Sequence, residues 1–152
     1  MTVSRRALIA VAAALPVAAL FGRSATARTP QVYANRGIAV DGSDVVAYFK
    51  DGRPVAGSHS ITHEWRGATW RFSSEENRDA FAANPTAYAP QFGGYCAWAV
   101  SEGYTASTIP EAWKIVDGKL YLNFSRSVQR RWERDIPGRI AAANRNWPGV
   151  LG

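Results

Sequence analysis

The chain has one cysteine, one methionine and two histidines among its 152 residues. A single cysteine excludes an internal disulfide, and the spacings Cys-x-x-Cys, Cys-x-x-Cys-His and His-Glu-x-x-His, typical of metal and haem sites, do not occur. The sequence also lacks internal repeats, low-complexity blocks and linkers. These absences favour one domain and leave Cys96 as its only thiol.

The first 27 residues have the order of a cleavable signal peptide. Arg5-Arg6 precedes an uncharged run over residues 7–22, and Ala25-Thr26-Ala27 supplies a small-x-small cleavage site. The run is short for a membrane span and contains Pro16, which disfavours an uncleaved anchor. The arginine pair resembles a twin-arginine export signal, although an ordinary secretory signal is the alternative. We expect residues 1–27 to be removed and the protein to be periplasmic or otherwise exported, with no membrane span left.

Charge gives little reason to expect a nucleic-acid partner. Cleavage after Ala27 removes three of the 18 basic residues and none of the 12 acidic ones, so a formal charge of +3 remains. Glu133 and Asp135 interrupt the arginines near the C-terminus, which favours a solvated helix face over a nucleic-acid or lipid surface. These arginines are Arg126, Arg130, Arg131, Arg134, Arg139 and Arg145.

Two pairs of short apolar segments predict β-hairpins. Residues 61–65 and 68–72 flank Arg66-Gly67, and residues 113–116 and 119–122 flank Asp117-Gly118. The earlier runs 37–40 and 45–49 are also predicted to be strand-like, because a turn-rich connection separates them.

Helix signals lie between and after the hairpins. Ser73 with Glu76 forms a capping box for a helix that ends near Ala83, with Phe81 as its core anchor. After Ser125, apolar residues recur every four positions, and Asp135 ahead of Pro137 predicts the start of a second C-terminal helix.

Together these elements predict an α+β fold: a small antiparallel sheet built from short hairpins, packed with one central helix and two C-terminal helices. Residues 28–36 are expected to form a flexible lead-in and residues 37–148 a single domain.

The segment from His63 to Asn123 resembles an exported subfamily of the YHS domain. The resemblance rests on Trp65-x-Gly67-Ala68-Thr69-Trp70-x-Phe72, on Pro90-Gln91-x-Gly93-Gly94-Tyr95-Cys96-Ala97 and on Ala112-Trp113-x-Ile115-Val116-Asp117-Gly118. The likeness implies a small α+β module, and YHS domains elsewhere are thought to bind metal through cysteines near the hairpin and the following helix. In this sequence the corresponding residues, 72–77, include no cysteine. Some exported members resemble this sequence but have selenocysteine at the position of Cys96, which implies a reactive group there.

A functional thiol needs partners. A nearby cation, imidazole or helix N-terminus would favour the thiolate. His63 is expected to share one strand face with Trp65 and to be able to reach Cys96 across the sheet, whereas His59 is expected in an exposed loop. Gly93 and Gly94 would give close backbone access.

Three functions remain open at this stage. The first is a periplasmic YHS-like binding module in which Cys96, with His63 as a second ligand or base, binds a soft metal such as copper or acts as a redox thiol. The second is a small redox enzyme in which Cys96 cycles with an external thiol reductant. The third is an interaction domain whose cysteine is inert.

Overall fold

The computed structural model describes residue 14 and residues 27–152. The predicted signal peptide, residues 1–27, therefore lies almost entirely outside the described residues. None of the helices in the described part of the chain has the length and apolar character needed to cross a membrane.

A four-stranded mixed sheet forms the first half of the α+β fold. Its strand order is β1-β2-β4-β3, with β1 at Ala34–Asn35, β2 at Ile38–Ala39, β3 at Ser58–Trp65 and β4 at Ala68–Phe72. The predicted hairpin of β3 and β4 is confirmed, with His63 opposite Trp70. However, β2 runs parallel to β4, so the sheet is not wholly antiparallel. A parallel pair needs a long crossover, and the segment between β2 and β4 provides it.

That crossover contains a helix where the sequence predicts a strand-like run. Residues Val45–Lys50 form α1, after a 3-10 turn, η1, at Val40–Gly42. The prediction of extended structure over residues 45–49 is wrong because Asp44 caps this helix: its Oδ1 accepts hydrogen bonds from the amides of Val46 at 3.0 Å and Ala47 at 3.3 Å. A short apolar run does not distinguish a strand from a buried helix, so the capping residue decides.

The central helix is confirmed one residue later than predicted. Helix α2 spans Glu75–Ala83, and its cap is Ser74, whose hydroxyl accepts the Asn77 amide at 3.1 Å. Phe81 is fully buried and lies against the rings of Trp65, Trp70 and Phe72. Two short turns of helix follow, α3 at Pro85–Tyr88 and η2 at Gln91–Gly94.

The second half consists of helices around the second hairpin. The elements are α4 (Ala97–Glu102), β5 (Trp113–Val116), β6 (Lys119–Leu122), α5 (Arg126–Glu133), α6 (Ile136–Asn146) and η3 (Gly149–Leu151). Asp117 and Gly118 both have positive φ, 50° and 74°, as a type I′ hairpin turn requires. Asp135 accepts the Gly138 amide at 3.1 Å, which confirms the predicted start of α6.

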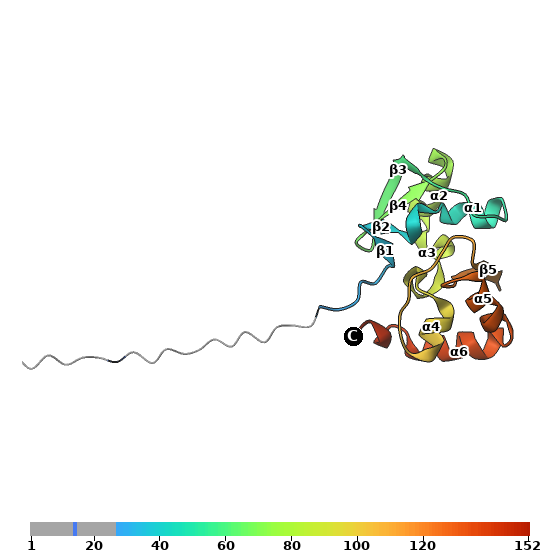
Figure 1. The fold of residues 1–152 in the computed structure, drawn as a ribbon. Coiled ribbons are helices and arrows are strands. Elements are labelled where there is room, and N and C mark those ends of the chain that lie inside the picture. Colours follow the sequence, from blue (N-terminus) through green and yellow to red (C-terminus); the bar gives the residue numbers. More distant parts are fainter. Residues whose placement is uncertain (1–13, 15–26) are drawn as a thin grey trace, which may run out of the picture.

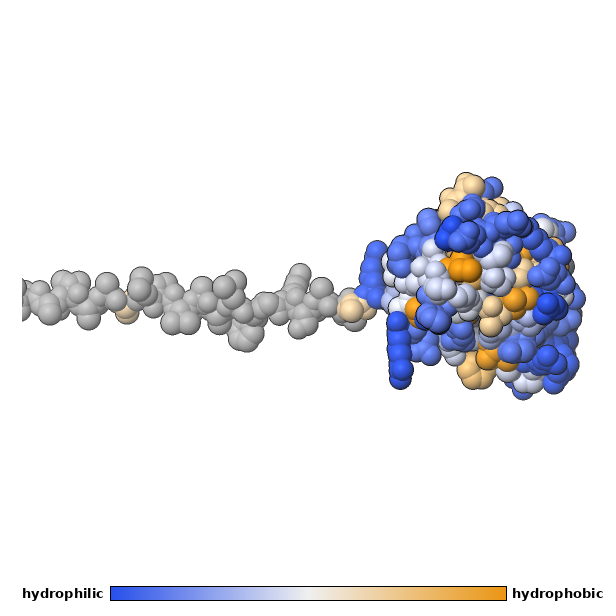
Figure 2. Space-filling model, turned by 90° about the horizontal axis from the view of Figure 1, so that it is seen from above, coloured by the Kyte–Doolittle hydropathy of each residue, from blue (hydrophilic) through white to orange (hydrophobic). Residues whose placement is uncertain are grey.

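The two halves have separate apolar clusters. In Figure 1 the sheet, α1 and α2 form the upper part of the molecule, and α4, α5, α6 and β5 form the lower part. The first cluster surrounds Trp70 and Phe81, the second surrounds Tyr121 and Trp132, and Tyr33 packs against both. On the face shown in Figure 2, hydrophilic residues predominate and apolar residues occur in small patches.

The segment predicted to be a flexible lead-in is tied to both clusters. Val32 is buried, the Tyr33 amide donates to the Gly93 carbonyl at 2.9 Å, and the Thr29 amide donates to the Leu151 carbonyl at 2.9 Å. The Tyr95 hydroxyl also donates to the Pro30 carbonyl at 2.7 Å. Burial of an apolar side chain and paired backbone groups both oppose local opening, so this segment belongs to the folded domain.

Candidate functional site

Cys96 lies at the junction between η2 and α4. Its carbonyl accepts the Val100 amide at 3.0 Å, the first hydrogen bond of α4, and its amide donates to the Ala106 carbonyl at 3.0 Å. The residue is 1% exposed. Its backbone is therefore fixed on both sides, and the thiol has no direct path to solvent.

The sulfur has one hydrogen-bond donor and one acceptor beside it, both at the end of β6. The Phe124 amide donates to Cys96 Sγ at 3.2 Å, and Sγ lies 3.6 Å from Asn123 Oδ1, to which the thiol hydrogen donates. The same Asn123 oxygen accepts the Trp98 amide at 3.1 Å. Asn123 thus connects the thiol to the first turn of α4.

Opposing effects act on the acidity of this thiol. Burial raises the pKa of Cys96 above its usual value, and hydrogen bonding by the backbones of Ala99, Phe124 and Trp98 lowers it in part. The Phe124 amide contacts the sulfur at 3.2 Å, whereas the Trp98 amide donates to Asn123. Burial is the larger effect, so the pKa of the Cys96 thiol lies above its ordinary value.

Asn123 is the polar side chain that the sequence did not reveal as part of the site. It is fully buried, and its Nδ2 has no hydrogen-bond partner among the described residues. Its backbone is held by the Ile109 amide at 3.2 Å and by the Ala112 carbonyl at 2.9 Å. Asn123 belongs to the segment that resembles YHS domains, but its pairing with a residue 27 positions earlier has no local signal.

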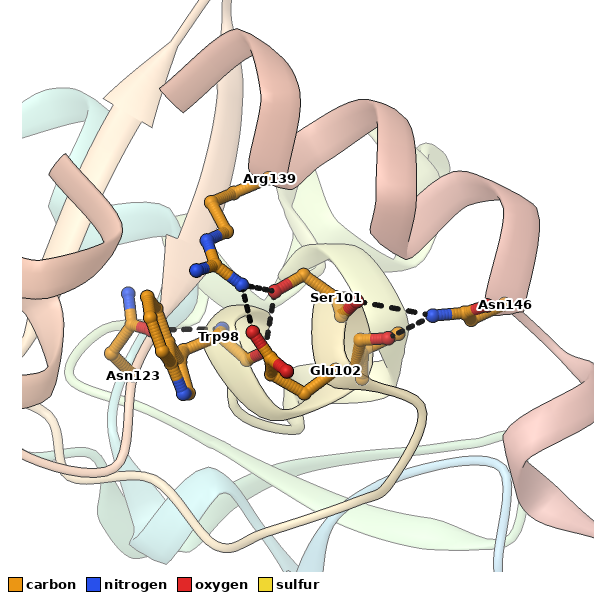
Figure 3. A network of polar contacts seen from close by, with 7 residues as sticks. Trp98, Ser101, Glu102, Asn123, Arg139 and Asn146 are labelled. Atoms are coloured by element: carbon orange, nitrogen blue, oxygen red, sulfur yellow. Dashed lines mark hydrogen bonds and ion pairs between the residues drawn. The ribbon is translucent and has the colours of Figure 1, made fainter. Parts of the chain in front are cut away.

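A second polar network holds α4 against α6. Figure 3 shows Arg139 reaching from α6 to the side chains of Ser101 and Glu102, while Asn146 reaches to backbone carbonyls in the same last turn of α4. The Arg139 guanidinium lies 3.6 Å from the centre of the Trp98 ring. Cation–π contact and an ion pair together fix the Trp98 side chain. The other arginines near the C-terminus, Arg126, Arg130, Arg131 and Arg134 in and after α5 and Arg145 in α6, are exposed.

The two histidines lie in the other half of the molecule. His63 is half-buried on β3, and its ring packs edge-on against Phe81 with centroids 6.0 Å apart. His59 is exposed and lies within β3 itself. Within the described residues, no hydrogen bond or ring contact joins His63 to Cys96. The structure places the predicted imidazole on β3 beside Phe81, and the thiol at the start of α4 beside Asn123.

The paired glycines allow close packing of the chain on itself. Gly93 has φ of 62°, and a Cβ there would lie 2.0 Å from the Gln31 carbonyl oxygen. Gly94 has φ of 86°, and a Cβ there would lie 2.5 Å from Val40 Cγ1. The close approach that these glycines permit is to the lead-in and to η1.

No model of a known protein family matches the chain, and no curated protein and no solved structure is similar to it.

The residues around Cys96 do not fit a soft metal ion. Such ions favour two or more thiolate, thioether or imidazole ligands, and the polar side chain beside Cys96 is an amide. The described residues contain no group of three histidine, cysteine, aspartate or glutamate side chains placed to share an ion. What the arrangement does offer is a single protected thiol with a backbone donor directed at its sulfur.

Proposed function

We propose that this protein is an exported YHS-like domain that works by reversible oxidation of the Cys96 thiol. The observation that carries the proposal is the contact of the Phe124 amide with Cys96 Sγ at the start of α4. A donor in that position stabilises negative charge on sulfur, as in a thiolate or a sulfenate. Family membership rests on the residue pattern, and export rests on Arg5-Arg6 and Ala25-Thr26-Ala27.

The chemistry requires an oxidant and a reductant from outside. The Cys96 thiolate attacks a hydroperoxide oxygen, an S–O bond forms as the O–O bond breaks, and the leaving oxygen takes a proton from water. Sulfur loses the two electrons that the peroxide gains, and a sulfenic acid results. An external thiol then forms a mixed disulfide with release of water, and a second thiol restores Cys96 and leaves as a disulfide with the first.

Burial controls the rate of this chemistry. Because Cys96 is 1% exposed, reagents reach the sulfur only when the structure around it opens locally. Because burial raises the pKa of the thiol, the thiolate fraction at neutral pH is below that of a free cysteine. The Cys96 thiol therefore reacts slowly, and its burial protects it from oxidants that cannot reach it.

The test is to label sulfenic acid on the folded protein. Exported protein is treated with hydrogen peroxide in the presence of dimedone, and intact mass measures the adduct and shows whether the chain begins at Arg28. We expect dimedone to label the wild type but not Cys96→Ser. Because the pKa of Cys96 is raised, the rate at which the wild type is alkylated should still increase at pH values above those at which a free cysteine has fully ionised.

Two outcomes contradict the proposal. If Cys96 is labelled only after denaturation in urea, it is an inert core residue, and an interaction domain is the remaining function. If the wild type retains copper at a fixed ratio that Cys96→Ser loses, the thiol binds metal instead, with ligands beyond those near Cys96.

A further inference from the structure

A cleft of about 350 Å³ lies where the two apolar clusters meet. Its aromatic lining includes Trp65 of the sheet half and Trp147 of the helical half, which are half-buried, with the buried rings of Trp70 and Phe92 beside them. This volume is within the range of sites that bind small molecules, and such sites commonly occur between subdomains and have mostly apolar walls. The cleft therefore has the size and the position of a small-ligand site, with a lining that is partly aromatic and partly polar.

The charged residues that line the cleft are all basic. Arg66 and Lys119, which lie at the turns of the two hairpins, line it together with neutral polar residues, and no lining residue is acidic. Neither cation forms an ion pair within residues 27–152. The Arg66 guanidinium lies 4.2 Å from the centre of the Trp65 ring, which keeps its charge at the edge of the aromatic surface. Two unpaired cations beside aromatic walls favour an anion with a flat apolar body.

Contacts within each wall fix the aromatic side chains of the cleft when no ligand is bound. The Trp70 indole donates to the Trp65 carbonyl at 3.1 Å, which fixes the Trp70 ring in the sheet wall. On the opposite wall, the Trp147 ring packs against Phe92 with centroids 6.0 Å apart. A cleft with fixed walls binds with less loss of conformational freedom than one that must be ordered first.

We propose that this cleft binds a small planar aromatic carboxylate. The aromatic body lies against the half-buried rings of Trp65 and Trp147. The carboxylate interacts with Arg66 and Lys119, and the guanidinium offers two parallel donors. Gln91 and Asn144 also line the cleft and provide neutral donors and acceptors for further polar groups of the ligand. This binding is independent of the thiol chemistry, since no residue of the cleft contacts Cys96 Sγ through a hydrogen bond.

The test is a calorimetric titration with 2-naphthoate, compared with neutral 2-naphthamide and with inorganic phosphate. We expect 2-naphthoate to bind at one site per chain, and both reference compounds to bind at least about tenfold more weakly, because each lacks one of the two recognised features. R66Q/K119Q should weaken 2-naphthoate by about tenfold or more. Cys96→Ser should bind like the wild type.

The matched control is R53Q/R130Q, which removes two positive charges from exposed positions outside the cleft. It should leave 2-naphthoate affinity within about twofold of the wild type, since distant surface charges are screened. The proposal is overturned if 2-naphthoate does not bind, if phosphate binds equally well, or if the two double variants bind alike. Circular dichroism of each variant confirms that the fold is kept.

Discussion

Asp44 shows how much one buried carboxylate can organise. It is fully buried, and besides capping α1 through Oδ1 it accepts three hydrogen bonds through Oδ2. These come from the Ser73 amide at 2.8 Å, the Ser73 hydroxyl at 2.7 Å and Asn77 Nδ2 at 2.8 Å. A buried charge is tolerated where donors surround it. One side chain thereby joins the crossover helix to the end of β4 and to α2.

Replacing Asp44 with alanine should lower the free energy of unfolding by about 3 kcal/mol or more, because several buried donors lose their acceptor at once. Urea unfolding followed by tryptophan fluorescence measures the change. Asp79→Ala is the control: Asp79 is exposed and pairs with the neighbouring Arg78 at 3.0 Å, so its loss should cost less than about 1 kcal/mol. Equal midpoints for the two variants would show that the Asp44 bonds contribute little.

The contacts of Asp44 show which features of the molecule can be predicted from the sequence and which cannot. Phe81 and Trp70 are recognisable as core from their chemistry and spacing, and both are buried. The partners of Asp44 lie 29 and 33 positions away, and Asn123 lies 27 positions from Cys96. No local pattern records such pairs. The thiol is therefore predictable from the sequence, whereas its immediate surroundings are not.

The elements that the sequence predicts have local signals, although the Asp44 cap of α1 shows that a local signal can be missed. Both hairpins turn at residue pairs that tolerate positive φ, Arg66-Gly67 and Asp117-Gly118, and the C-terminal helices begin at side-chain caps. The parallel pairing of β2 with β4 rests on contact between distant segments. The 3-10 turn η2 likewise depends on its tertiary neighbours, since Phe92 within it has φ of 58°, which the structure around it must hold.

Gly93→Ala should therefore be more destabilising than Gly118→Ala. Both glycines have positive φ, but a Cβ at Gly118 meets nothing within 4 Å, whereas one at Gly93 meets the Gln31 carbonyl oxygen. We expect about 1 kcal/mol for Gly118→Ala, from backbone strain alone. For Gly93→Ala we expect about 3 kcal/mol or more, since displacement of the lead-in is added. Thermal or urea unfolding measures both losses of stability. Equal losses for the two variants would mean that the lead-in can move away from the added Cβ at little cost in free energy.

At the scale of the whole molecule, the lead-in completes the packing between the two clusters. Val32 belongs to the first cluster, while Thr29 and Tyr33 bond to residues of η3 and η2. The hairpin and helix signals predicted the α+β fold class correctly. They could not predict that residues ahead of the first strand would be part of it, because a short polar segment acquires structure only from partners supplied by the rest of the fold.

A chain that begins at Tyr33 should accordingly be less stable than one that begins at Arg28. Removal of residues 28–32 exposes the site of Val32 and leaves the Leu151 carbonyl and the Tyr95 hydroxyl without their partners. The expected loss is about 2–3 kcal/mol in the free energy of unfolding, measured by urea titration of both chains. Coincident unfolding curves would show that the lead-in adds nothing to stability.

The bond between Thr29 and Leu151 also has a topological consequence. The beginning and the end of the folded region lie side by side, as Figure 1 shows for the lead-in and the C-terminus. The path of the backbone is thus nearly a closed ring. A few residues of linker could close it, and the exposed turn at Asp117-Gly118 offers a place to open it again, giving a circular permutant with the same neighbours throughout.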